Sequence, residues 1–109
     1  MEKYIQDVLE FDERYKVDNK PTYSNLFYMG LCITGEAGEL VNVIKKIWRD
    51  GDSKGLRMKL AEELVDVMIY VCKLIIVGEI DFDKARERKL KVLRKRWNKK
   101  KTTERQVRL

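Results

Sequence analysis

The sequence predicts an all-α protein, a four-helix bundle in a single domain. Three observations favour this fold class: the chain has 109 residues, it contains one proline and six glycines, and its leucine, methionine, lysine and glutamate content favours helices. One core of this size buries roughly two-thirds of the unfolded surface, so no second domain is expected. We assign residues 1–98 to a helical domain and residues 99–109 to a basic C-terminal tail.

The first two helices follow from spacing and cap residues. Apolar residues at helical spacing predict a helix over residues 2–17, and the segment VDNKP ends it because a residue before proline is biased away from the α conformation. Thr22 or Ser24 can cap a second helix. This helix runs to about Arg49, where RDGDSKG is typical of a turn.

The last two helices are delimited in the same way. The third is expected over residues 54–77, and Gly78 ends it. Asp81 or Asp83 can cap the fourth, which runs past Trp97. The short connections between all four helices are typical of a bundle.

The third predicted helix is apolar nearly all round between Leu64 and Val77, and one small bundle can scarcely cover it. A second subunit is expected to pack there, giving a homodimer or a dimer of dimers, a homotetramer. The apolar run is too short for a membrane span and contains Asp66 and Lys73. With no signal-peptide pattern and two cysteines that lack metal-ligand spacing, we expect a cytoplasmic protein with reduced thiols and no membrane partner.

The net charge of +6 is unevenly distributed. Residues 84–109 contain thirteen Lys or Arg and two Glu, a local charge of +11, whereas residues 1–83 carry −5. Such a basic segment can bind a phosphate backbone, so a nucleic-acid-binding helical module is an alternative function. Against it, the segment contains no base-reading motif, and an acidic body is a poor partner for a polynucleotide.

Histidine is absent from the sequence. Its absence excludes Ser-His-Asp and Cys-His catalysis, the helix-borne His pair of zinc proteases and the Glu-x-x-His ligands of di-iron bundles. The metal ligands that remain are carboxylate oxygens, which suit Mg²⁺, Mn²⁺ or Ca²⁺.

Two acidic pairs lie inside the second and third predicted helices. Glu36 and Glu39 stand three apart in GEAGELVNVIKK, and Glu63 and Asp66 repeat the spacing in AEELVDVMIYVCKL. Each pair occupies one helix face, so four carboxylates can meet if the two helices are antiparallel. Solvated faces of amphipathic helices would explain either pair alone. Together, and among apolar residues, the acids repel one another unless cations bind between them.

The residues EAGE at 36–39, a spacer of 23 residues and ELVD at 63–66 resemble the E-x-x-E and E-x-x-D signature of the MazG-like all-α nucleoside triphosphate pyrophosphohydrolases. This superfamily includes dCTP pyrophosphatase and the dimeric dUTPases, and the resemblance covers about residues 23–97. It implies hydrolysis of a nucleoside triphosphate between the α- and β-phosphates, which gives a monophosphate and pyrophosphate. It also implies Mg²⁺ as the cofactor, with Mn²⁺ as a possible substitute.

The resemblance implies four metal ligands: Glu36, Glu39, Glu63 and Asp66. Glu39 and Glu36 are also the expected catalytic residues, Glu39 by orienting or deprotonating the attacking water. Glu62 is a second choice because it points about 100° away from Glu63. A purely structural oligomerisation bundle is a third hypothesis, and it leaves the paired acids unexplained.

The fourth predicted helix resembles a second family pattern, K-x-x-x-N-x-x-R followed by an aromatic residue, which contacts phosphates in some relatives. Lys89, Arg96 and Trp97 match it, whereas Leu93 replaces the asparagine. Any one of the candidate cations would be an ordinary solvated charge in a purely structural interpretation. The candidate substrate-binding residues are the cations Lys46, Lys73, Lys89 and Arg96 for the triphosphate, and Tyr70 and Trp48 for stacking on the base.

Overall fold

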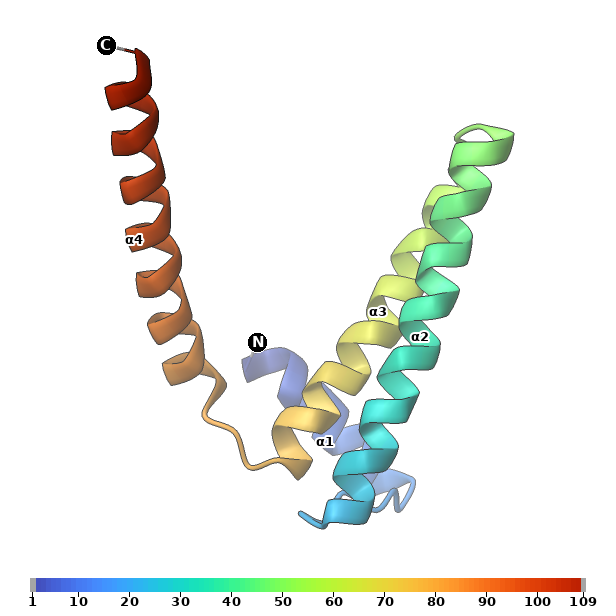
Figure 1. The fold of residues 1–109 in the computed structure, drawn as a ribbon. Coiled ribbons are helices and arrows are strands. Elements are labelled where there is room, and N and C mark those ends of the chain that lie inside the picture. Colours follow the sequence, from blue (N-terminus) through green and yellow to red (C-terminus); the bar gives the residue numbers. More distant parts are fainter. Residues whose placement is uncertain (1, 109) are drawn as a thin grey trace.

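The computed structural model describes residues 2–108 of the chain, and the side chains up to residue 101. These residues form four helices and no strand: α1 (Glu2–Arg14), α2 (Tyr23–Asp50), α3 (Lys54–Val77) and α4 (Phe82–Arg108) (Figure 1). The predicted all-α class is confirmed, although α1 ends before residue 17. In this part of the chain, no helix combines the length and the hydropathy that crossing a bilayer requires.

Short polar side chains start three of the helices. Thr22 caps α2, Ser53 caps α3 and Asp81 precedes α4, each accepting a hydrogen bond of 3.1 to 3.2 Å from the backbone amide three residues later. Each such cap stabilises a helix by about 1 kcal/mol, because first-turn amides have no partner within the helix. Gly51 ends α2 at φ 92°, a conformation that glycine adopts without strain.

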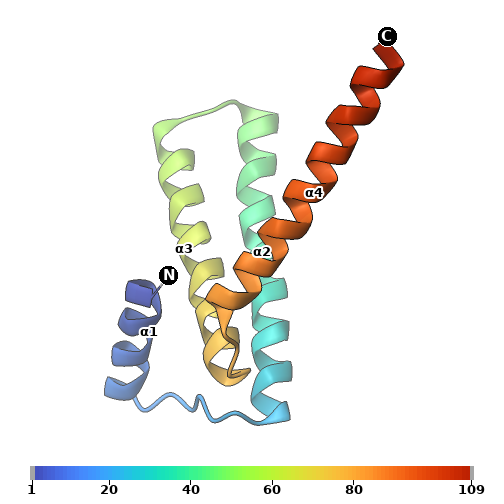
Figure 2. The ribbon, with the colours of Figure 1, turned by 90° about the vertical axis from the view of Figure 1, so that its left-hand side faces the viewer.

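The packed centre of the molecule is an antiparallel hairpin of α2 and α3, joined by residues 51–53. Its buried side chains include Met29 and Val43 from α2 and Cys72 and Ile75 from α3. The shorter α1 lies along the half of α3 that is farther from the 51–53 turn (Figure 2). Since α3 contacts both α1 and α2, it is the central helix of the packed part.

Beyond its first turn, α4 stands apart from the other helices (Figures 1 and 2). The radius of gyration is 18.7 Å, whereas a compact chain of this length has about 13 Å. Trp97 is consequently 61% exposed. The expected packing of the fourth helix into the bundle therefore does not occur within one chain. The helix also continues past residue 98, so the division between domain and tail stays a prediction.

A buried ion pair holds α1 against α3. Asp12 is 2% exposed, and its Oδ1 lies 3.4 Å from Nζ of Lys73. Its Oδ2 accepts a hydrogen bond of 2.6 Å from Nδ2 of Asn19, in the connection that follows α1. Both charges lose hydration on burial, so each depends on the other for compensation. The pair thereby fixes the position of α1 along α3.

Replacing Asp12 by Ala is expected to destabilise the protein by about 3 kcal/mol, because the Lys73 ammonium is then buried without a counter-charge. The double variant Asp12→Asn/Lys73→Met removes both charges and roughly keeps the shape, so it should regain most of the loss. Urea unfolding followed by circular dichroism measures both free energies. Equal losses in the single and double variants would contradict a coupled pair.

Candidate functional site

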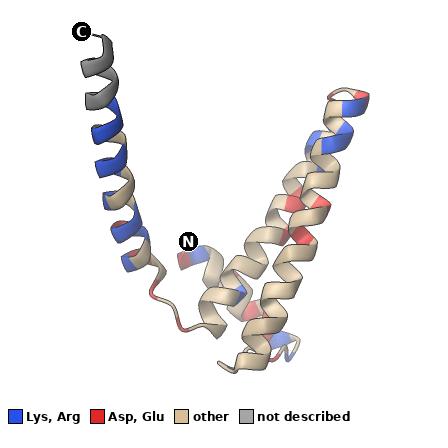
Figure 3. Cartoon of the chain, viewed as in Figure 1, with Lys and Arg blue, Asp and Glu red and all other residues tan. Residues whose placement is uncertain are grey.

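Three carboxylates converge in the middle of the α2–α3 hairpin. One oxygen each from Glu36, Glu39 and Glu63 lies within 4.8 Å of the other two. Glu36 and Glu63 are half-buried, and Glu39 is exposed at the edge of the group. Figure 3 shows acidic residues of the two helices facing one another at this level. The structure thus brings three of the four predicted acids together, and their role as metal ligands stays a prediction.

Apolar packing holds these carboxylates in place. Met29 and Val43 are buried, and each lies seven residues from Glu36, so the three side chains share one face of α2. That face packs against α3. Glu36 therefore occupies a central position in the contact stripe of α2, where the pattern would ordinarily place an apolar residue.

Neighbouring negative charges raise the energy of the ionised site. Burial raises the pKa of Glu36, and the charges of Glu39, Asp66 and Glu63 raise it further. Burial also raises the pKa of Glu63, helped by Glu39 and Asp66, whereas Lys59 lowers it. Oε2 of Glu36 and Oε2 of Glu63 are both buried without a hydrogen-bond partner. Such oxygens are costly to keep unless something else binds them.

Asp66 and Tyr70 extend the site along α3. Asp66 is half-buried and lies outside the group of three, but its charge acts on both buried glutamates. Burial raises the pKa of Tyr70, and Cys32, Tyr28 and Glu36 contribute to the shift. Tyr70 therefore lies close to the acidic group, and its predicted contact with a base stays a prediction.

Three residues near the acids were not predicted from the sequence, although their spacing could have indicated them. Tyr28 and Cys32 precede Glu36 by eight and four residues, so they lie along one side of α2 that leads to the carboxylates. Lys59 precedes Glu63 by four residues on α3, the ordinary spacing of a helical ion pair. The spacing of four residues that connects these side chains with Glu36 and Glu63 was the feature of the sequence that could have indicated them.

The predicted cations do not gather around the acids within one chain. Lys73 is paired with Asp12 on the α1 side of α3. Lys46 and Trp48 are exposed on α2, Trp48 by 90%. The remaining two candidates belong to α4, which stands away from the hairpin (Figure 3). As substrate-binding residues, all of these stay predictions.

The fold and the site define an all-α protein with carboxylates that converge from two helices, and the comparisons identify the family. The sequence model of the MazG nucleotide pyrophosphohydrolase domain matches residues 27–101, so the chain belongs to this family. The chain is also similar to Gene 37 protein of Mycobacterium phage L5, with 38% identity over an alignment of 74 residues that covers 65% of this chain and 65% of the phage protein. No solved structure shows a significant match.

The donor set at this site fits a hard divalent cation. All three converging ligand atoms are carboxylate oxygens, which Mg²⁺ and Mn²⁺ prefer. Two of the carboxylates also have a buried oxygen without a hydrogen-bond partner, on Glu36 and Glu63. A bound cation would neutralise the same charges that raise both pKa values.

The contribution of Glu36 and Glu63 to the stability of the metal-free protein should fall as pH rises. Because the pKa values of Glu36 and Glu63 are higher in the folded state, the folded state keeps these protons at a pH where the unfolded state has released them. Below the unfolded pKa, about 4.3, both states are protonated and the penalty is absent. Glu36→Gln is therefore expected to raise the apo Tm at pH 7 and to change it little near pH 4.

Thermal unfolding by circular dichroism, with and without millimolar Mg²⁺ or Mn²⁺, measures this effect. Metal should raise the Tm of the wild type more than that of Glu36→Gln, because only the wild type keeps the full ligand set. Glu13→Gln, at an exposed position of α1, is the control for the change in net charge. An apo Tm of Glu36→Gln below the wild-type value at pH 7 would contradict the repulsion argument.

Proposed function

We propose that this protein is a nucleoside triphosphate pyrophosphohydrolase that uses Mg²⁺, or Mn²⁺, to cleave a (d)NTP into the monophosphate and pyrophosphate. The observation that carries the proposal is the convergence of Glu36, Glu39 and Glu63 from two helices, with two buried oxygens that lack partners. Membership in the MazG nucleotide pyrophosphohydrolase domain family supports it. A structural bundle has no use for these carboxylates, which destabilise it.

The different exposure of the acids suggests different roles. We assign Glu36, Glu63 and Asp66 to metal binding, because all three are half-buried and close together in the hairpin. A bound divalent cation would neutralise the triphosphate and the departing pyrophosphate. Glu39 is the exposed member of the group, so its carboxylate can reach a solvent water and orient or deprotonate it. This role of Glu39 is compatible with its expected role as a metal ligand.

We further propose a homodimer or homotetramer in which a neighbouring copy covers α2. Tyr23, Phe27 and Leu31 are spaced four apart on this helix and are all exposed, Tyr23 by 92%. This spacing places them along one side of the helix, where they form an apolar stripe that one chain leaves in water. A stripe of large apolar side chains is typical of a surface that another molecule covers.

The neighbouring copy would also supply further cations to the acidic site, where Lys59 already acts on Glu63. Helix α4 presents Lys89 and Arg96 on nearly one face, together with Leu93 and Trp97. Residues 84–109 carry +11, whereas the hairpin, residues 23–77, has seven basic and seven acidic residues, so the charge complementarity between α4 and the hairpin of another copy is restricted to the acidic group. Arg96 and Lys89 would then contact the triphosphate, Arg96 in bidentate geometry.

A specific alternative is that α4 binds a polynucleotide, since its basic surface stands clear of the body (Figure 3). Such binding would weaken steeply with salt and would require none of the hairpin carboxylates. A fluorescence-anisotropy titration with single- and double-stranded DNA at two salt concentrations separates this function from hydrolysis.

Incubation with Mg²⁺ and each dNTP should release a nucleoside monophosphate and pyrophosphate in equal amounts, and a chelator should stop the reaction. Glu39→Ala is expected to lower kcat about 10²-fold or more, because the attacking water loses its general base. Ion-exchange chromatography measures both products, and reaction in ¹⁸O-water locates the attacked phosphorus. Release of orthophosphate alone, or full activity of Glu39→Ala beside the Glu13→Gln control, would contradict the assignment.

Light scattering is expected to give a mass at least twice the 13.0 kDa of the chain.

Arg96→Ala should cost about 2 to 4 kcal/mol of transition-state stabilisation, whereas replacing Lys99, Lys100 and Lys101 together by Ser should change hydrolysis little at moderate salt. If α4 acts on the neighbouring copy, mixing Arg96→Ala with Glu39→Ala subunits should restore about a quarter of the activity, through mixed dimers with one intact site. An inactive mixture of exchanging subunits would place α4 at the site of its own chain.

A further inference from the structure

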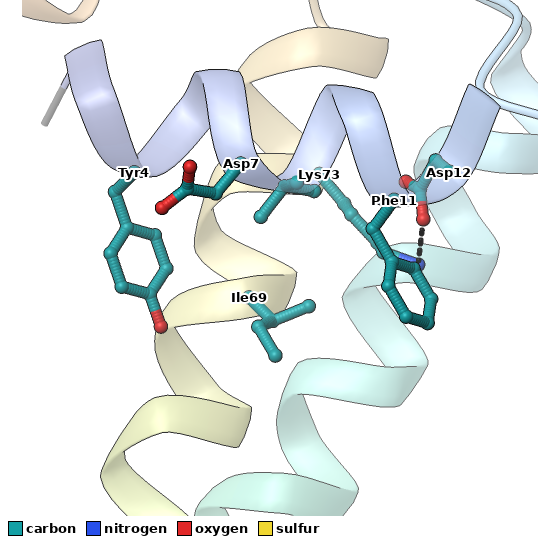
Figure 4. Close-up of a pocket in the computed structure, with 7 residues that line it drawn as sticks. Tyr4, Asp7, Phe11, Asp12, Ile69 and Lys73 are labelled. Atoms are coloured by element: carbon teal, nitrogen blue, oxygen red, sulfur yellow. Dashed lines mark ion pairs between the residues drawn. The ribbon is translucent and has the colours of Figure 1, made fainter. Parts of the chain in front are cut away.

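A second feature of α3 is a pocket of about 300 Å³ on the side that faces α1. The rings of Tyr4 and Phe11 extend from α1 on either side of Ile69, which belongs to α3 (Figure 4). Asp12 and Lys73 also line the pocket, and Figure 4 places their ion pair beside Phe11. The walls are therefore apolar and aromatic, with charged groups restricted to a few positions.

Lys73 gives this pocket a hydrogen-bond donor. Its ammonium carries three N–H groups. It lies 3.4 Å from Oδ1 of Asp12 and 5.4 Å from the centre of the Tyr70 ring. One carboxylate oxygen does not use three donors, so Lys73 can bind a further acceptor that enters the pocket. Its side chain is largely buried, at 13% exposure, which strengthens such a bond relative to one in water.

The pocket adjoins the acidic site along α3. At its Tyr4 end, the hydroxyl of Tyr4 donates to the backbone carbonyl of Val65 at 3.4 Å, one residue before Asp66. The charge of Asp66 contributes to the raised pKa of Tyr4, behind burial and Cys72, which places the two groups near each other. With a rise of 1.5 Å per residue, Ile69 lies about 4.5 Å beyond Asp66 along the helix. Within one nucleotide, the base is separated from the phosphates only by its sugar.

We infer that this pocket receives the nucleobase of the substrate and that Lys73 donates a hydrogen bond to a carbonyl oxygen of the base. The inference rests on the proposed function, and it names the class of substrate. Uracil, thymine, cytosine and guanine carry an exocyclic oxygen, whereas adenine carries none. Tyr4 and Phe11 provide ring faces on which any base can stack, so the ammonium of Lys73 is the group that discriminates.

The size of the pocket also favours a base over a piece of another protein. A cavity of about 300 Å³ is at the lower end of small-molecule sites, and a helix of about 10 Å diameter does not fit between α1 and α3. Asp7 lies at the Tyr4 end in Figure 4, where its carboxylate can accept from an amino or imino group of the base. A base with a donor group at one end and a carbonyl oxygen at the other could therefore contact both ends of the pocket.

Binding can be tested without hydrolysis and without metal. Deoxynucleoside monophosphates at millimolar concentration are titrated into ¹³C-methyl-labelled protein, with the methyl groups of Ile69 and Val8 as reporters. The dUMP, dCMP and dGMP titrations should shift these signals with an affinity about tenfold higher than that of dAMP, the value expected for one hydrogen bond to a charged donor. Equal affinities for all four, or no shift at Ile69, would overturn the inference.

Two variants test the same pocket by a second route. Ile69→Trp fills it and should raise KM for a keto-base triphosphate about tenfold with a much smaller change in kcat, whereas Met58→Trp, at an exposed position of α3, controls for the added ring. Asp12→Asn/Lys73→Met removes the donor and should abolish the preference over adenine in the titration. A preference that survives in the double variant would show that Lys73 does not read the base.

The outcomes keep the two proposals separate. If no triphosphate is hydrolysed but keto nucleotides still shift the Ile69 methyl groups selectively, the pocket is supported and the proposed reaction is wrong. If hydrolysis occurs and Ile69→Trp leaves KM unchanged, the reaction stands and the pocket inference fails. Signals of Ile69 that respond to subunit association and not to nucleotide would likewise overturn it, because a neighbouring copy would then occupy the pocket.

Discussion

Electrostatic repulsion within an apolar contact is the constraint on which this structure depends. Glu36 stands between Met29 and Val43 on the face of α2 that packs against α3, and Glu63 faces it with a buried oxygen of its own. The packing that stabilises the hairpin is the same packing that dehydrates the carboxylates. These carboxylates thus lower the stability of the fold at the position where a cation would be held. Functional sites commonly reduce the stability of the folds that contain them.

The sequence predicted the four helices and the acidic group because both depend on local spacing. Caps at Thr22 and Asp81 and the three-residue spacing of the acids are fixed by the helix itself. Lys73 shows the limit of such reasoning. Because Lys73 lies in line with the acids, it was predicted to bind the triphosphate. Helical periodicity shows toward which side of its own helix a residue points, but it does not identify the residue of another helix that lies there. Its partner Asp12, 61 residues earlier, brings Lys73 to α1. The separation of α4 from the other helices was not predicted either, because helical spacing does not show whether a helix packs on the rest of the chain.

Helix α3 connects two chemically different environments. Toward α2 it presents Glu63 to a group of carboxylates, and toward α1 it presents Ile69 and Lys73 to an aromatic pocket. In the proposed enzyme, one rigid helix would therefore set the distance between the phosphates and the base. The buried pair of Lys73 with Asp12 has the same importance for this spacing as the apolar contacts of the hairpin, because it fixes α1 relative to α3.

The exposed position of α4 makes its coil-to-helix equilibrium sensitive to dissolved anions. A helix without tertiary packing depends on its own sequence for stability, and like charges four residues apart oppose the helical state. Lys84 and Arg88, and Lys91 and Lys95, are such pairs. Multivalent anions weaken this repulsion more effectively than simple salts, and a nucleoside triphosphate is itself one. The helical content of the last quarter of the chain should accordingly rise with the concentration of the compound that the protein is proposed to consume.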